Sequence, residues 1–329
     1  MSETVSPAVH KFFHSIIDYA GLFPPASLKL RDAFSNFLNY RQGYFAWLLS
    51  RFICPAGKVR ELSELVSADL LEDPVKLSLL AGQFQDQNEF IRKFSDDITF
   101  YRELPQDFHD YVRTESIEIR IPDEIAISND KNRISDFLDS LTDVIKENFE
   151  HRVFLFCEIP RLDNFDSLLK HTVRGIELHN EKASDAGFKL RTGGTEAGDF
   201  PDPAIVLHAI RQCLNHKVPL KFTAGMHHPF RHYDSGIGTK MHGFINVFGA
   251  GVLAFRHPVS DHELKQMIAD EDAENFGFSD GHFRWKDWIC TPEEIHGARN
   301  SLVISYGSCS FDEPVEDLLE LKYLTPTSN

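Results

Sequence analysis

The chain has 329 residues, of which 42% are hydrophobic and 26% are charged, so it is large and apolar enough to bury a substantial core. Its formal net charge of −16 argues against a nucleic-acid backbone or an anionic membrane surface as the main partner, because both bind basic protein faces. No stretch approaches the roughly 18 consecutive apolar residues of a membrane-spanning helix.

The N-terminal residues lack the basic-then-apolar pattern of a secretion signal, and the five cysteines are scattered without a Cys-x-x-Cys pair. Cys54, Cys157 and Cys213 lie in apolar runs, where a free thiol behaves as a small buried hydrophobe. We therefore expect a cytoplasmic protein, and the spacing indicates neither a thiolate zinc site nor a disulfide framework.

Short apolar runs alternate along the chain with longer amphipathic stretches, which is typical of βα units. The predicted strands are Ile16–Tyr19, Ala46–Ile53, Val75–Leu80, Ile117–Ile121, Val153–Glu158, Phe188–Thr192, Leu220–Thr223 and, as the eighth, either Phe276–Trp285 or Leu302–Tyr306. The predicted helices include Lys58–Leu70, Asn88–Phe94, Ile134–Asn148, Asp163–Lys170 and Ala204–Leu214. Asp202 and Pro203 give the last helix a capping residue and a proline at its first position.

Seven or eight such units favour an α/β fold, a closed (β/α)8 TIM-like barrel that spans residues 1–329 as one domain. Extra elements are expected at about residues 256–300. A doubly wound open sheet is the alternative, because periodicity alone does not show closure.

Charged residues alternate with apolar ones on three of the predicted strands. Glu118 and Arg120 share one face of their strand, as do Lys189 and Arg191 on theirs, and Lys221 opposes apolar neighbours on the next. Helices cover the outside of a barrel, so the charged side chains should face the interior near its C-terminal mouth. We therefore predict that all five lie in one place.

Lys189 and Lys221 are 32 positions apart, the length of one strand-loop-helix unit. Both should point inward from neighbouring strands, and two nearby cations lower each other's pKa. A neutral amine can attack a carbonyl and form a Schiff base. Arg191 adds a permanent charge that can hold a carboxylate or phosphate.

The segments "FKLRTGG" and "LKFTAG" resemble the two lysine strands of class I aldolases of the deoxyribose-phosphate aldolase type. The resemblance implies that Lys189 forms the Schiff base, that Lys221 lowers its pKa, and that Thr223 and Gly225 lie in an anion-holding turn. Glu118 would stand in for the aspartate of the fourth strand. Here Arg191 replaces a small hydroxyl residue, and "GMHHPFRH" replaces the family's glycine-rich phosphate turn.

Four further segments, "DYAGLFPPA", "KLRTGG", "KFTAGMHHP" and "YGSCSFDEP", resemble a bacterial protein family that has no assigned activity. That resemblance spans most of the chain and implies no particular chemistry.

Histidines cluster after the seventh predicted strand. His227 is a candidate proton donor or acceptor, and His228 a substrate ligand. The alternative is a divalent metal held by Glu158, His227 or His228, and His242, with Asp18 as a further candidate. The remaining substrate-binding candidates are Arg51, Arg120, Thr192, Gly193 and Gly194, and "GTEAGDF" is a candidate nest of N–H groups for an anion.

Three hypotheses follow for one pocket. The first is a cofactor-free, aldolase-like lyase acting on a small anionic carbonyl compound through Lys189 and Lys221. The second is a metal-dependent hydrolase or isomerase, and the third is an anion-binding barrel without catalysis. A homo-oligomer is compatible with all three.

Overall fold

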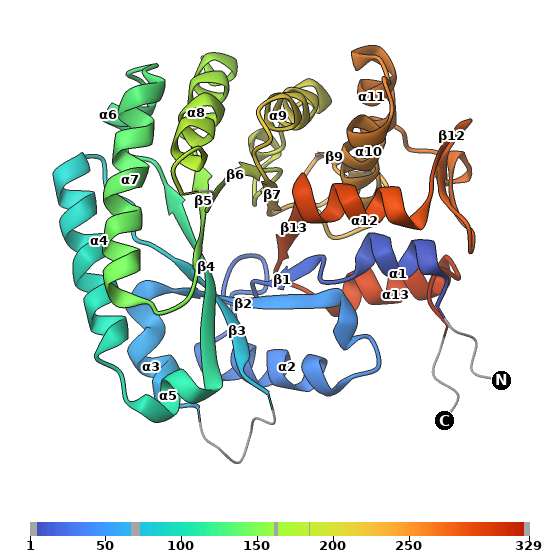
Figure 1. The fold of residues 1–329 in the computed structure, drawn as a ribbon. Coiled ribbons are helices and arrows are strands. Elements are labelled where there is room, and N and C mark those ends of the chain that lie inside the picture. The colour runs from blue at the N-terminus through green and yellow to red at the C-terminus, as the bar shows by residue number, and fades with distance from the viewer. Residues whose placement is uncertain (1–4, 67–72, 161–163, 184, 326–329) are drawn as a thin grey trace. The chain divides into compact units, whose positions relative to one another are not determined.

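The computed structural model describes residues 5–66, 73–160, 164–183 and 185–325 (Figure 1). Eight parallel strands form a closed barrel surrounded by helices, which confirms the predicted TIM-like fold and excludes the open sheet. In chain order, the barrel strands are β1 (Ile17–Tyr19), β2 (Leu49–Pro55), β3 (Val75–Leu80), β4 (Val112–Arg120), β5 (Phe154–Glu158), β6 (Ala186–Arg191), β7 (Leu220–Thr223) and β13 (Val303–Ser308).

The predicted strands agree with the barrel strands except at some of their ends. The largest differences are that β4 begins at Val112, five residues before the predicted start, and that Ala46–Leu48 forms a turn of 3-10 helix before β2. Of the two alternatives for the eighth strand, Leu302–Tyr306 is right. The segment Phe276–Trp285 belongs to a separate antiparallel sheet made of β10 (Phe276–Phe278), β11 (Phe283–Trp285) and β12 (Trp288–Cys290).

The helices are α1 (Pro7–Phe13), α2 (Leu30–Gln42), α3 (Val59–Ser63), α4 (Gln87–Arg102), α5 (Gln106–Tyr111), α6 (Asp123–Ala126), α7 (Lys131–Asn148), α8 (Phe165–Asn180), α9 (Pro203–Asn215), α10 (Phe244–Arg256), α11 (Asp261–Ile268), α12 (Pro292–Ser301) and α13 (Asp312–Glu320). None of the described helices combines the length and the apolar character needed to cross a bilayer. The predicted start of α9 is confirmed, because the Asp202 side chain accepts the Ala204 N–H and Pro203 is the first helical residue.

The other predicted helices differ from the observed ones at their ends. Helix α7 begins three residues before Ile134, and α4 and α8 continue to Arg102 and Asn180, beyond the predicted ends at Phe94 and Lys170. The described part of Lys58–Leu70 contains α3, which ends at Ser63, while residues 67–70 lie outside the described residues. Likewise Asp163 lies outside them, and α8 begins at Phe165.

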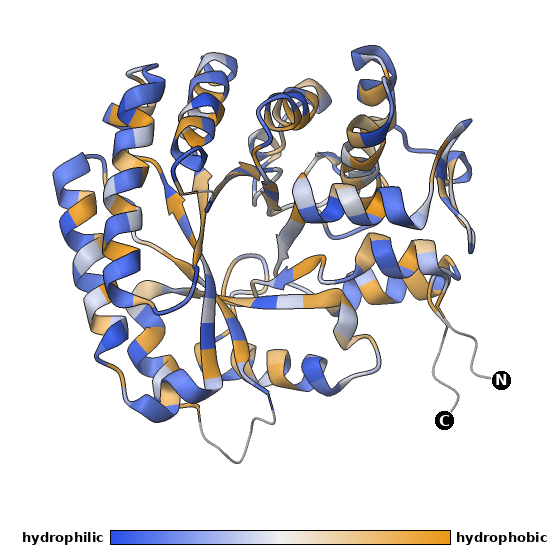
Figure 2. Cartoon of the chain, in the orientation of Figure 1, coloured by the Kyte–Doolittle hydropathy of each residue, from blue (hydrophilic) through white to orange (hydrophobic). Residues whose placement is uncertain are grey.

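The chain divides into two compact units, one formed by residues 28–35 and 51–189 and the other by residues 1–27, 36–50 and 190–329. In the first unit, β3, β4, β5 and β6 pair side by side. Helix α7 buries residues spaced three or four apart, including Ile134, Leu138, Leu141 and Ile145, so one face packs inward. Figure 2 shows the resulting mixture of hydrophobic and hydrophilic residues along α7.

In the second unit, β13 pairs with β1 on one side and β7 on the other. Helix α10 is buried from Phe244 to Ala254, as expected for a helix that is apolar on all sides. Aromatic side chains form much of the core here, and Tyr306 packs between Phe244 and Phe248. Residues 256–300 contain α11, the antiparallel sheet and α12.

Two short strands, β8 (His232–Asp234) and β9 (Thr239–Met241), form a hairpin between β7 and α10.

Candidate functional site

Lys189 lies at the centre of a buried polar cluster in the first unit. Its Nζ is 2.9 Å from Oε2 of Glu158 and 3.1 Å from Oε2 of Glu118. The three residues come from β6, β5 and β4, which are adjacent, and Lys189 is only 4% exposed. Alternation explains the arrangement, because Ile117, Ile119 and Phe188 on these strands are buried on the opposite face.

Serines extend this cluster toward β3. Ser78 Oγ donates to Oε1 of Glu118 at 2.8 Å, and Ser116 Oγ donates to Ser78 Oγ at 2.8 Å. Both carboxylate oxygens of Glu118 therefore have a donor, which fixes the position of this buried anion. Neither serine was predictable from the sequence, because a lone serine in a strand is common.

The expected lowering of the Lys189 pKa is not observed. Burial by itself lowers the pKa of this amine, but the negative charges of Glu158 and Glu118 and their hydrogen bonds outweigh it. The net effect raises the pKa of Lys189 above its ordinary value. Lys189 is therefore an ammonium ion at neutral pH, and its carboxylate neighbours are the groups placed to receive its proton.

Lys221 occupies a second buried cluster, in the other unit. Its Nζ lies 2.7 Å from Oδ2 of Asp18, and Ser305 Oγ donates to the same oxygen at 2.6 Å. All three residues are fully buried, and they come from the neighbouring strands β7, β1 and β13. Asp18 is thus an ion-pair partner of the second lysine.

The three arginines predicted to bind substrate have different environments. Arg120 is half-buried at the end of β4, where it forms an ion pair with Asp123 at 3.1 Å and donates a hydrogen bond to Gln83 at 3.3 Å. Arg51 pairs with Glu115 at 3.1 Å. Arg191 is exposed, and its Nε donates to the carbonyl of Gly193 at 3.0 Å. Of the charges predicted to lie together on β4 and β6, Glu118 and Lys189 are therefore buried and in contact, whereas Arg120 is half-buried and Arg191 is exposed at the ends of their strands.

The turns after β6 and β7 are joined by direct backbone contact. Thr192 Oγ1 donates to the carbonyls of Ala224 at 2.7 Å and Thr223 at 3.1 Å. A Cβ added to Gly193 or to Gly225 would lie 2.6 Å from the Cα of the other glycine. Gly225 also has a φ of +73°, so glycine suits both its conformation and its surroundings.

The candidate nest in "GTEAGDF" is occupied by the chain's own carboxylate. Asp199 Oδ2 accepts the N–H groups of Thr195 at 3.0 Å and Glu196 at 3.2 Å. A Cβ on Gly194 would lie 2.1 Å from that oxygen, so the glycine makes room for it. The prediction that these N–H groups bind an external anion is wrong, because an internal one takes that place.

The histidines after β7 mostly bond to protein groups. Nδ1 of His227 is 2.9 Å from Glu313, and Nδ1 of His228 is 2.7 Å from Asp317, both on α13. His242 is fully buried, with Nε2 at 2.8 Å from the carbonyl of Pro201 and Nδ1 at 3.1 Å from Arg231.

Burial lowers the pKa of His242 to about 4, so the ring is neutral at pH 7. Both of its nitrogens are engaged, and it has none left for a metal ion. The alternative site formed by Glu158, His228 and His242 is therefore not supported, and Glu158 instead binds Lys189.

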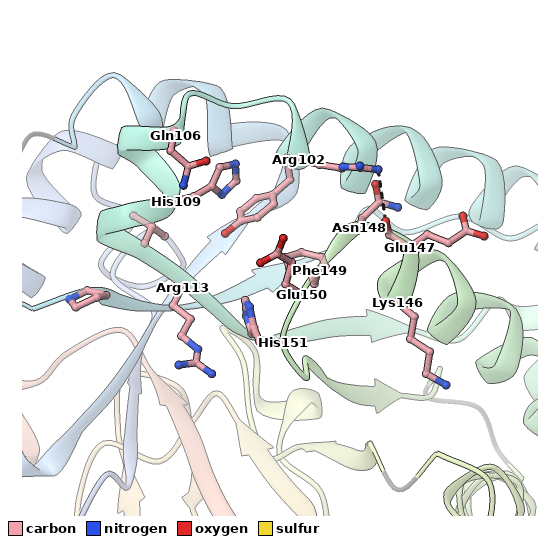
Figure 3. A pocket seen from close by; sticks show the side chains of 13 residues that line it. Arg102, Gln106, His109, Arg113, Lys146, Glu147, Asn148, Phe149, Glu150 and His151 are labelled. Atoms are coloured by element: carbon pink, nitrogen blue, oxygen red, sulfur yellow. Dashed lines mark hydrogen bonds between the residues drawn. The ribbon is translucent and has the colours of Figure 1, made fainter.

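In the first unit, a cavity of about 930 Å³ opens at the N-terminal end of β4 (Figure 3). Its lining includes Val112 and Arg113 at the start of β4, together with Tyr101, His109 and His151. Active sites of such barrels lie at the C-terminal ends of the strands. Glu118 and Glu158 lie at that end of β4 and β5, so we take the Lys189 cluster, and not this cavity, as the candidate site.

The sequence matches no protein-family model and no curated protein.

Proposed function

We propose that the protein is an aldolase-like lyase in which Lys189 forms a Schiff base with a small anionic aldehyde or ketone. One observation carries the proposal, namely the contact of the buried Lys189 ammonium with Glu158 at 2.9 Å and Glu118 at 3.1 Å. Keeping a charged cluster in a barrel core costs several kcal/mol, to order of magnitude, unless every charge is paired. Such clusters are concentrated where catalysis or ligand binding requires them.

The chemistry balances without a cofactor. Lys189 gives up a proton to Glu158 or Glu118, and its Nζ attacks the carbonyl carbon to form a carbinolamine. The carbonyl oxygen then leaves as water, which takes two of the three ammonium protons, and a C=N bond to a protonated nitrogen forms. When the bond between the α and β carbons of this iminium breaks, its electron pair forms the C=C bond of an enamine. The β-hydroxyl gives its proton to a carboxylate, and that fragment leaves as an aldehyde.

The carboxylates supply the proton transfers that these steps need. Glu118 is held by Ser78, and it is the residue that the aldolase resemblance puts in place of an aspartate on the fourth strand. Its contact with Lys189 supports that assignment. In the proposal, the exposed Arg191 guanidinium, two residues after Lys189 in the sequence, holds the anionic group of the substrate.

The other two hypotheses have less support. A role in anion binding without catalysis would give no function to the two carboxylates that contact the Lys189 ammonium. A metal-dependent reaction has less support because both ring nitrogens of His242, one of its predicted ligands, are hydrogen-bonded to protein groups.

The test is reductive trapping. The protein is incubated with pyruvate, glyoxylate or glycolaldehyde phosphate, reduced with borohydride, and analysed by intact and peptide mass spectrometry. We expect one substrate-sized increment on Lys189 that is absent from Lys189→Met. Because the Lys189 pKa is raised, the amine fraction and the trapping rate should rise about tenfold per pH unit between about pH 7 and 10.

Lys76→Met is the matched control, since Lys76 lies on β3 of the same unit with 55% of its side chain exposed. It should trap as the wild type does. Adducts on exposed lysines alone, with Lys189 unmodified by every compound, would overturn the proposal, and an adduct on Lys221 would reassign the nucleophile.

A further inference from the structure

A group of potential metal ligands lies in the second unit, and none of its members takes part in the proposed reaction. His257, Cys290 and Glu294 each offer one ligand atom, and these three atoms lie within 4.8 Å of one another. It is the one group of this kind among the residues that the structure describes. His257 follows α10, Cys290 ends β12, and Glu294 lies in the first turn of α12.

The histidine has the hydrogen bond expected of a metal ligand. Its Nε2 is 2.8 Å from the backbone carbonyl of Ile289, so this nitrogen carries the proton. The lone pair is then on Nδ1, which can bind a cation. Metal-binding histidines almost always donate their other N–H to a carbonyl or carboxylate in this way.

The cysteine is a buried free thiol beside an acidic residue. Burial first, and then the charge of Glu294, raise the pKa of Cys290 to about 12. Without a metal ion, the negative charge of Glu294 disfavours the thiolate form of Cys290. A divalent cation between the two would turn this unfavourable proximity into an attraction, since it binds both as anions.

Glu294 has capacity for another partner. One of its oxygens accepts the backbone N–H of Thr291 at 2.9 Å, and the other accepts Nε of Arg256. A carboxylate has about four lone-pair positions, so these two bonds leave room for a metal. The Arg256 side chain is 55% exposed and can move into solvent as the cation binds.

We propose that His257, Cys290 and Glu294 bind a divalent ion of the zinc type, with water as the fourth ligand. A nitrogen, a sulfur and a carboxylate oxygen are the ligands that zinc takes in a tetrahedral site. Binding replaces the thiol proton, so each ion bound releases one proton and nothing is oxidised or reduced. The ion would join the end of α10 to β12 and to α12, which leads into barrel strand β13.

The inference is independent of the Schiff-base proposal, because none of its three residues takes part in that reaction.

Cobalt provides a direct readout of the thiolate. The full-length protein is freed of metal with a chelator and titrated with Co²⁺, and the sulfur-to-cobalt charge-transfer band is followed in the near ultraviolet. We expect saturation at one equivalent and loss of the band when Zn²⁺ is added. Cys290→Ser should abolish the band, and His257→Asn should weaken Co²⁺ binding about tenfold or more.

Two further variants separate ligation from folding. Glu294→Gln keeps a side chain able to bond the Thr291 N–H, so it should leave α12 intact and still weaken Co²⁺ binding. Cys309→Ser removes another buried thiol and should leave the band unchanged. No band in the wild type, or an equal band in Cys290→Ser, would overturn the proposal.

A measurement on the wild type alone guards against variants that fail to fold. Zn²⁺ is added in weakly buffered solution, and bound zinc is counted by native mass spectrometry while released protons are counted with an indicator. One zinc and one proton per chain support the site. No retained zinc, or zinc retained without proton release, contradicts it.

Discussion

Lys189 on β6 and Lys221 on β7 are both lysines of barrel strands, yet their surroundings differ. Lys189 contacts two carboxylates, and a serine on β3 fixes one of them. Lys221 contacts the carboxylate of Asp18, and the same oxygen of Asp18 also accepts a hydrogen bond from Ser305. The comparison shows that the spacing of strands in the sequence identifies pairs of inward-pointing lysines. The acidic side chains on the neighbouring strands determine the electrostatic environment of each amine.

Replacing Lys189 should have the largest effect on stability. Lys189→Met leaves the buried Glu118 and the half-buried Glu158 without the cation they contact, which should lower the free energy of unfolding by about 4 kcal/mol at pH 7. Urea denaturation measures this directly. The folded-state pKa of Lys189 is raised, so its contribution is complete below about pH 10 and is lost only at higher pH.

Lys189→Met/Glu118→Gln is the control, and it should recover part of the loss because one buried charge is removed. A loss below about 1 kcal/mol in the single variant would mean that water reaches the carboxylates.

Replacing Lys221 should cost somewhat less. Lys221→Met removes the cation that contacts Asp18, which retains the Ser305 hydrogen bond, and we expect a loss of about 3 kcal/mol in the same measurement. Lys221→Met/Asp18→Asn should be more stable than the single variant. A larger loss for Lys221→Met than for Lys189→Met would reverse the ranking of the two clusters.

The serines should have the smallest effects and sharpen the comparison. Ser78→Ala and Ser305→Ala each remove a donor to a buried carboxylate, so each should cost about 2 kcal/mol. Ser116→Ala removes only a bond between two hydroxyls and should cost about 1 kcal/mol. Equal losses for Ser78→Ala and Ser116→Ala would show that Glu118 does not depend on its serine.

Much of the fold was predictable, because strand and helix periodicities differ and the barrel strands are short and regular. The alternation in "SIEIRIP" and "FKLRTGG" separated the apolar face from the face that carries Glu118 and Lys189. The choice of the eighth strand was not predictable, since two apolar segments were equally suitable and only pairing with β1 and β7 distinguishes them.

The site was predictable only in part. The spacing of Lys189 and Lys221 predicted that each cation lowers the pKa of the other. The pKa of Lys189 is instead raised by Glu118 on β4 and Glu158 on β5, which the spacing of the lysines does not take into account. Glu158 was considered only as a metal ligand. His257 and Cys290 are 33 positions apart, so no local motif brings them together with Glu294.

The buried position of Arg299 was not predictable from the sequence either. It is buried near the barrel and donates to the backbone carbonyls of Phe12 and His14.

The contact between Gly193 and Gly225 has a consequence for how this protein can change. With two backbones touching and no side chain between them, neither turn can be rebuilt without moving the other. Barrels of this kind differ in function mainly through variation of their loops. In this chain the loops after β6 and β7 are coupled by that contact, so a change in one should require a compensating change in the other.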